Sequence, residues 1–303
     1  MPVPRPPPKA IAARSTGAIG MADDLIRPIE EADVPAVCRL MAESFPRRDV
    51  GYFERGFERL AAAPEVPGCT RYGYVIDDGG LRGAALGIPS LHDYGHRRQP
   101  FVNISTWCVA PSHRGPLAKA LYDRTGANAA AVNTNLSAAA HTIRTLEKLG
   151  FEPWTTGQFL ALRARGPRPD SRVVAHDARG APTLAAHHAR VLDDHAGFGC
   201  LTPVIDAEDG PVPLVLLPRR VARAVPVAQV IYCERRADLG RHAGALLRWV
   251  RRRARAGLLI DADDPIEGFA GRHYPGKAAK YLRGARPEYD VEHTYSEMVR
   301  LGF

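Results

Sequence analysis

Residues 101–121, FVNISTWCVAPSHRGPLAKAL, contain a turn whose residue types favour phosphate binding. The apolar run predicts a strand, and the segment from Pro116 predicts the start of a helix. The first N–H groups of a helix lack intrahelical acceptors and carry the positive end of the helix dipole, so they stabilise an anion. Glycine permits close approach by a ligand, and proline pre-sets the first helical turn. We expect phosphate contacts from Arg114, Gly115 and the amides of Leu117 and Ala118.

Other side chains that could do chemistry lie farther along the chain. His141 is a candidate acid or base because imidazole titrates near neutrality, although a surface or capping histidine is equally consistent with its position. Asn133 and Asn135 end a short predicted strand, where they would bind a ligand or shape the turn. His92 and His96 lie in the polar segment LHDYGHRRQ, and we expect this loop to touch a substrate. The glycine between them argues against a helical metal pair.

Cysteine usage argues against a disulfide framework and against a zinc site. The five cysteines are scattered, odd in number and never paired as CxxC. The histidines at 187, 188 and 195 fit no familiar zinc spacing either, so we expect no metal. A reducing cytoplasm is the expected location. The N-terminal residues 1–20 are Pro-rich and polar, which predicts a flexible tail rather than a secretory signal, and no apolar run approaches the length of a membrane span.

The charge balance is basic, with 41 Lys and Arg against 33 Asp and Glu and a net charge of +8. Such a chain attracts anions of several kinds, including nucleic acid and phosphorylated small molecules. The densest cluster, WVRRRARAG at 249–257, is typical of the solvated face of a helix. No RNA-binding motif, helix-turn-helix or zinc-finger spacing lies nearby, so nucleic-acid binding through this helix is the less favoured alternative.

The elements that must position these residues follow from periodicity and turn signals. Before the phosphate-type turn, the pattern predicts a strand at 25–29, two helices over 31–63, and a hairpin of two strands joined at 77–80. After it, the pattern predicts a helix to 126, a strand at 129–135, a helix over 137–150 capped by Ser137, and one or two strands to 164.

The second half repeats this plan more loosely after a Pro/Gly/Arg linker at 165–171. Helices are predicted at 182–197 and 239–257, and strands at 211–220, 226–234 and 258–263. A broken helix is predicted over 265–284 and a closing strand over 293–303. We infer an internal duplication, with a tail at 1–20, a first unit at 21–164 and a second, degenerate unit at 172–303.

This order of elements, with VAPSHRGPLAKAL after a central strand and TLEKLGF closing a later helix, resembles the GNAT superfamily of acyl-CoA-dependent acyltransferases. The chain is also similar to double-GNAT bacterial proteins that share the NxSxAxHTxxxLExxGF pattern and a Tyr-Ser/Thr-Glu ending. The resemblance implies an α/β (α+β) fold of two GNAT-like units, each a mixed, splayed sheet flanked by helices. It implies acyl-CoA between the fourth and fifth strands, with its pyrophosphate on the turn at Arg114. The amides of Cys108 and Val109 would then hold the oxyanion.

The chain departs from the family pattern at three places. The turn Arg114-Gly115-Pro116 lacks the family's middle glycine and is one residue shorter. Thr106 stands where many members have a glutamate, and Leu146 stands where many have the tyrosine that protonates the departing thiolate. His141 is the candidate that would replace them, and the second half is expected to shape the acceptor pocket and cover the open sheet edge of the first.

Two functions remain open on these grounds. One is transfer of an acyl group, an acetyl group being expected, from acyl-CoA to an amine of a small-molecule or sugar-type acceptor. The other is a non-catalytic protein that binds acyl-CoA or another anion on the same fold. The acceptor, the length of the acyl chain and the oligomeric state do not follow from the sequence.

Overall fold

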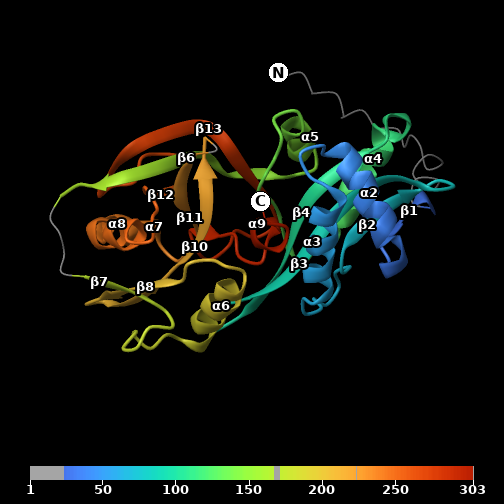
Figure 1. Ribbon diagram of the computed structural model, residues 1–303. Coiled ribbons are helices and arrows are strands. Elements are labelled where there is room, and N and C mark those ends of the chain that lie inside the picture. Colours follow the sequence, from blue (N-terminus) through green and yellow to red (C-terminus); the bar gives the residue numbers. More distant parts are fainter. Residues whose placement is uncertain (1–23, 167–170, 223, 303) are drawn as a thin grey trace, which may run out of the picture.

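The computed structural model describes residues 24–166, 171–222 and 224–302. The expected tail at 1–20 and most of the expected linker lie outside this part of the chain. In the described residues, two units of mixed α/β structure lie side by side and share one long mixed sheet (Figure 1). This agrees with the expected fold class.

The first unit is built around six of the strands of the long sheet and four helices. Its elements are β1 (Ile26–Pro28), α2 (Val34–Ser44), α3 (Val50–Ala61), β2 (Gly73–Asp77), β3 (Leu81–Asp93), β4 (Arg98–Val109), α4 (Pro116–Thr125), β5 (Val132–Asn135), α5 (Ile143–Lys148) and β6 (Glu152–Ala164). The expected hairpin joins β2 to β3. Helix α5 is shorter than the sequence predicts, and Ser137 lies in the loop before it instead of capping it.

The second unit contains a small separate sheet as well as its share of the long one. Its elements are β7 (Arg172–Ala175), α6 (Ala186–Gly197), β8 (Pro203–Ala207), β9 (Gly210–Pro213), β10 (Val215–Val221), β11 (Val225–Cys233), α7 (Arg236–Arg241), α8 (Ala243–Arg251), β12 (Leu258–Asp261), β13 (Phe269–Arg283), β14 (Val291–Glu292) and α9 (Glu297–Arg300). Strands β7, β8 and β9 form the small sheet.

Two sequence predictions for this unit are wrong. Residues 265–284 contain the long strand β13 and not a broken helix, because β13 is interrupted by an irregularity between Pro275 and Lys280 that disturbs the two-residue alternation. Residues 293–303 contain the short helix α9 and not a strand, because the Ser296 side chain caps it by accepting the N–H of Met298. Tyr274 and Tyr281, which the sequence places on that helix as possible acids, therefore lie on a strand.

The two units exchange one strand each at the centre of the long sheet. The strand order is β1-β2-β3-β4-β5-β13-β6-β12-β11-β10, so β13 of the second unit lies between β5 and β6 of the first. Equally, β6 lies between β12 and β13. Both exchanged strands run across the top of the view in Figure 1, in green and red. Neither half can therefore complete its sheet without a strand from the other.

Residues 291–300, here called the closing segment, return from the second unit to the first. Figure 1 shows α9 of this segment between the two units, beside α3 and β4. The contact is close: a Cβ built on Gly56 of α3 would lie 2.5 Å from Cδ2 of Leu301, directly after this segment, so a larger residue at 56 would displace the end of the Leu301 side chain. Helix α3 is fixed in turn by Asp49, whose side chain accepts the N–H of Tyr52.

The strand exchange predicts that the first unit will not fold alone. A fragment of residues 21–166 would leave β5 and β6 without the strand that lies between them, and unpaired strands promote aggregation. We expect this fragment to be insoluble or aggregated when expressed alone, and to become soluble when coexpressed with residues 171–303. Size-exclusion chromatography of both preparations measures this. A monomeric, folded 21–166 fragment would contradict the prediction.

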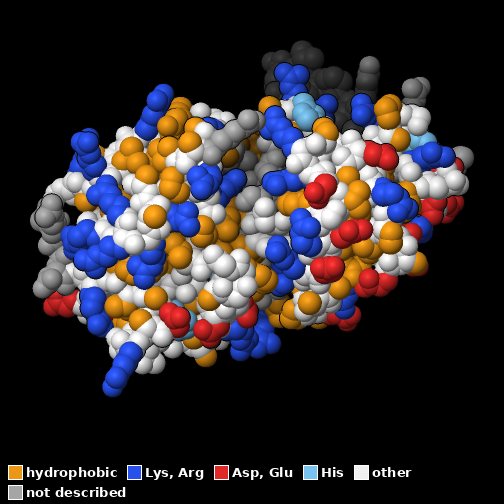
Figure 2. Space-filling model, in the orientation of Figure 1, with side chains coloured by type: hydrophobic (Ala, Val, Ile, Leu, Met, Phe, Trp, Pro, Cys, Tyr) orange, Lys and Arg blue, Asp and Glu red, His pale blue; other side chains and the backbone are white. Residues whose placement is uncertain are grey.

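Charged side chains cover both units on the face in Figure 2, where Lys and Arg are spread over the surface instead of forming one patch. No helix in the described residues has the length and apolar character needed to cross a membrane.

Candidate functional site

The candidate site lies where two parallel strands of the first unit separate. Strand β4 pairs with β5 only from Phe101 to Asn103, after which β5 ends while β4 continues. Thr106 has a φ of 49°, and the register between β3 and β4 shifts close by. Such a bulge bends a strand and increases its twist. The structure thus has an opening in the sheet at the place where the sequence predicts acyl-CoA.

A cavity of about 250 Å³ occupies this opening. It takes residues from β4, α4, the α2–α3 region and the loop between β5 and α5. Its lining is Phe45, Arg48, Tyr52, Phe53, Ser105, Thr106, Trp107, Tyr122, Asn135, Ser137, Ala138, Ala139, His141 and Thr142. Two of the predicted site residues, Asn135 and His141, are therefore brought together here.

The edge of β4 that faces the opening carries backbone groups with no neighbouring strand. The N–H of Ala110 donates to Arg82 O on β3 at 2.7 Å. Because N–H groups alternate along a strand, the N–H of Val109 is directed to the opposite edge, which β5 has left. A ligand in the opening could accept this hydrogen bond. The side chain of Cys108 is instead buried in the core under α2 and α3, where burial raises the pKa of its thiol to about 11.

The predicted phosphate turn follows directly after β4. Gly115 has a φ of 90° and precedes α4, whose first residue is Pro116. The turn is exposed, and Nε of Arg114 donates to Val109 O at 3.3 Å. The amides of Leu117 and Ala118 lie in the first turn of a ten-residue helix, where they have no intrahelical acceptor. The structure thus has a glycine with positive φ directly before a helix, and phosphate binding at this turn stays a prediction.

A buried carboxylate reaches this region from the closing segment. Glu297 is 1% exposed, and its carboxylate accepts a hydrogen bond from the Ser105 hydroxyl on β4. Its backbone N–H donates to Oδ1 of Asn103 at 2.8 Å. Burial raises the pKa of Glu297, and the hydrogen bond from Ser105 only partly opposes this effect. A carboxyl with a raised pKa is suited to proton transfer near neutral pH.

Glu297 therefore lies close to the place that the absent strand glutamate would occupy. Ser105 and Ser137 both line the cavity, and Glu297 lies directly behind them. Sequence reasoning missed this residue because it is 192 positions away from Ser105. The only signal was the Tyr-Ser-Glu ending, residues 295–297, which belonged to the family resemblance but had no assigned role.

A second buried network lies next to Glu297, at the junction of the two units. Asp261 is fully buried, and its carboxylate is 3.2 Å from Nζ of Lys280 and 3.4 Å from Nδ1 of His293. The side-chain amides of Gln158 and Gln229 donate to the same carboxylate at 2.9 and 3.0 Å. Burial alone would raise the pKa of Asp261, but the Lys280 ammonium and the hydrogen bond from Gln158 outweigh it and hold the pKa below its usual value. The network links β6, β11, β12 and β13.

The tyrosine and histidine of the cavity have different environments. Tyr122 is buried on α4, and its hydroxyl accepts from Nδ2 of Asn135 at 2.9 Å. Burial raises the pKa of this tyrosine, so the hydroxyl stays protonated at neutral pH. His141 is exposed at the cavity, in the turn before α5. Either group can donate a proton toward the opening.

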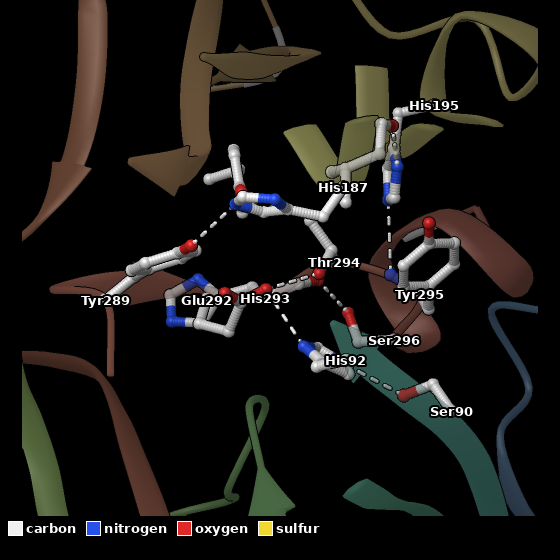
Figure 3. A network of polar contacts seen from close by, with 12 residues as sticks. Ser90, His92, His187, His195, Tyr289, Glu292, His293, Thr294, Tyr295 and Ser296 are labelled. Carbon is white, nitrogen blue, oxygen red and sulfur yellow. Dashed lines mark hydrogen bonds and ion pairs between the residues drawn. The ribbon is translucent and has the colours of Figure 1, made fainter. Parts of the chain in front are cut away.

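Three other predicted substrate residues lie outside this cavity. Asn133 is buried beside Gly126, with its Nδ2 on the carbonyl of Ala131 at 3.4 Å. His96 is at the surface, 3.4 Å from Glu288. His92 is buried and bound to the closing segment (Figure 3). Within the described residues, no group of three or more His, Cys, Asp or Glu side chains is arranged to hold a metal ion.

Comparison with family models and with curated proteins gives no match, whereas solved structures are similar to this chain. A GCN5-related N-acetyltransferase from Anabaena variabilis ATCC 29413 is 12% identical with a TM-score of 0.52; 85% of this chain and 72% of that chain are covered. A probable N-acyltransferase from Enterococcus faecalis V583 has 12% identity, the same coverage and a TM-score of 0.48. A GCN5-related N-acetyltransferase from Kribbella flavida has 16% identity, coverage of 85% and 71%, and a TM-score of 0.46. The first of these likenesses shows a shared fold.

Proposed function

We propose that this chain, which has the fold of the GCN5-related N-acetyltransferases, transfers an acyl group from acyl-CoA to an amine. The acyl-CoA would lie in the opening between β4 and β5, with its pyrophosphate on the turn from Arg114 to Ala118. The acceptor would be a small molecule or a sugar-type amine that enters the cavity of about 250 Å³.

The observation that carries this proposal is the carboxylate of Glu297 behind the cavity wall. An amine attacks a thioester only in its neutral form, so the site must remove a proton. In our proposal the proton passes from the acceptor to Glu297 through the Ser105 hydroxyl, which lines the cavity and is bonded to that carboxylate. The charge that forms on the thioester oxygen is stabilised by the N–H of Val109. His141 and Tyr122 are candidates for protonating the thiolate.

The same geometry weakens the case for a non-catalytic binding protein. That alternative drew its support from the missing glutamate and tyrosine on the usual elements. Glu297 provides a carboxylate from another part of the chain, and burial tunes it for proton transfer. A protein that only binds acyl-CoA would have no need for a desolvated carboxyl at this position.

The phosphate turn provides the first test. We expect Arg114→Ala to weaken acetyl-CoA binding about 10- to 150-fold, because charge-assisted contacts contribute about 1.5–3 kcal/mol. The loss should shrink for a pantetheine thioester, which has no nucleotide phosphates for Arg114 to contact. Isothermal titration calorimetry with both ligands measures the two effects.

Arg124→Ala is the matched control, since Arg124 is also exposed but lies in the last turn of α4, away from the phosphate turn. Its affinity for acetyl-CoA should equal that of the parent. If Arg114→Ala binds acetyl-CoA as tightly as the parent, the phosphate does not bind at this turn. Release of free CoA in the presence of a panel of amines then separates an enzyme from a binding protein.

A further inference from the structure

Three side chains outside the acyl-CoA opening form a hydrogen-bonded triad where the closing segment of the second unit meets the first unit. Oγ of Ser90 lies 2.9 Å from Nε2 of His92, and Nδ1 of the same imidazole lies 3.0 Å from Oε1 of Glu292 (Figure 3). Ser90 and His92 are two positions apart on β3, so their side chains share one face of the strand. Glu292 arrives on β14, from the closing segment.

The order in which the serine, the imidazole and the carboxylate are hydrogen-bonded determines what chemistry they can do. If Nδ1–H donates to the Glu292 carboxylate, the lone pair of Nε2 faces the Ser90 hydroxyl and can accept its proton. The imidazole is held in this orientation because it stacks on the Phe101 ring at 3.9 Å. The carboxylate is held by Thr294, whose hydroxyl donates to Glu292 Oε1 at 2.5 Å. His92 and Glu292 are 5% and 3% exposed, so water competes little for these contacts.

Ser90 is more accessible than its two partners and faces a cavity. It is half-buried and lines a space of about 380 Å³, a size within the range of small-molecule sites. Arg300 also lines this cavity and brings a positive charge to it. The other lining residues include both apolar and charged side chains, such as Leu91, Phe198, Tyr295, Arg98 and Asp194.

This cavity and the acyl-CoA opening share none of their lining residues. In the closing segment, Glu297 bonds to Ser105 at the opening, while Tyr295 and Arg300 line the cavity at Ser90. The chain of Ser90, His92 and Glu292 therefore has no part in the acyl transfer proposed above, and it needs another explanation.

We propose that Ser90, His92 and Glu292 form a second catalytic site, which hydrolyses a small acyl ester or acyl thioester through a serine nucleophile. Oγ of Ser90 bonds to the acyl carbon while its proton moves to Nε2 of His92. The alcohol or thiol then leaves with that proton, and an acyl-serine remains. Water attacks the acyl-serine, gives a proton to Nε2 and releases the carboxylic acid, after which the proton returns to Ser90. Glu292 is a positioning residue that orients the imidazole.

A surface group in the same chain provides a comparison. Ser112 Oγ lies 2.8 Å from Nδ1 of His113, and His113 Nε2 lies 2.9 Å from Asp78 Oδ2. This group also has a serine, a histidine and a carboxylate, with Asp78 in place of a glutamate. Here, however, Nδ1 faces the serine and Nε2 faces the carboxylate, and Ser112 is exposed. Among the described residues, a serine hydroxyl is thus bonded to a histidine ring at two places. Of these, only the Ser90 group has Nε2 facing the serine, Nδ1 facing the carboxylate and a buried imidazole.

A fluorophosphonate probe tests the nucleophile directly, because its phosphorus is attacked by an activated serine hydroxyl with loss of fluoride. We expect the folded, full-length protein to gain one phosphonyl group, mapped to Ser90 by peptide mass spectrometry. Heat-unfolded protein should not react. Ser90→Ala should abolish labelling, and Ser112→Ala, the matched control, should label like the parent. His92→Gln should slow labelling by about 10²-fold or more.

Hydrolysis of p-nitrophenyl acetate tests the role of Glu292. We expect Glu292→Gln to lower kcat and leave KM unchanged, because the variant binds the ester but orients the imidazole poorly. The proposal is overturned if the folded protein is not labelled, if labelling persists in Ser90→Ala, or if Ser90 reacts equally fast in His92→Gln. None of these results depends on acyl-CoA, so they leave the proposed acyltransferase function untouched.

Discussion

Glu297→Gln is expected to lower kcat/KM for acyl transfer by about 10²- to 10⁴-fold, the usual contribution of a positioned general base. The amide keeps the size of the side chain and can still accept from Ser105, but it cannot take a proton from the acceptor. Affinity for acetyl-CoA should remain that of the parent, because the phosphate turn is unchanged. Rates of CoA release, together with calorimetric titration of acetyl-CoA, measure both quantities.

The pH dependence of the same reaction has a defined direction. Because burial raises the pKa of Glu297, the carboxyl is protonated and inactive over a wider acid range than an ordinary glutamate, whose pKa is about 4.3. The rate of the parent should therefore fall as the pH drops through this raised pKa, and Glu297→Gln should lack that acid limb. Glu147 is an exposed glutamate of α5, so Glu147→Gln is the control and should show the pH dependence of the parent. Parental turnover in Glu297→Gln would exclude this residue as the base.

Lys280→Met is expected to lower the free energy of unfolding by about 3–5 kcal/mol, because it removes one partner of a buried ion pair and leaves the other charge unpaired. Asp261 is the charge that remains, with 0% exposure and the Lys280 Nζ at 3.2 Å. Urea denaturation followed by circular dichroism measures the loss. Lys277→Met, an exposed lysine on the same strand, should change stability by no more than about 0.5 kcal/mol.

The double variant Lys280→Met/Asp261→Asn distinguishes a lost ion pair from a general packing defect. With both charges removed, the cost of an unpaired buried carboxylate disappears, so part of the stability lost in Lys280→Met should return. If the double variant is as unstable as the sum of the single variants, the two charges are not coupled and the ion-pair explanation is wrong.

Local signals in the sequence predicted most of the strands and helices of the first unit. The DDGG hairpin joins β2 to β3, and the turn at Gly115 has the positive φ that glycine permits. These features depend on residues close together in the chain. The same signals failed in β13, where the irregular stretch between Pro275 and Lys280 hides the alternation of a strand.

The candidate site was predicted only in part, because its carboxylate is assembled by tertiary structure. Asn135, His141 and the turn at Arg114 follow from motifs on neighbouring elements. The position of Glu297 beside Ser105 results from the return of the closing segment to the first unit. No sequence pattern near Ser105 predicts this long-range contact. The strand exchange could not be predicted for the same reason. A sequence pattern predicts that β6 is a strand, but not which strands lie beside it.

The exchanged strand also determines when the first unit can fold during synthesis. Ribosomes synthesise a chain from its N-terminus, and N-terminal domains usually fold first. Here the strand between β5 and β6 of the first unit is β13, and its buried carboxylate is Glu297; both are translated after nearly all of the second unit. The nascent first unit must therefore wait until those residues emerge, with one edge of β5 and both edges of β6 unpaired. We expect such a chain to depend on chaperones during translation more than two independent units of the same size would.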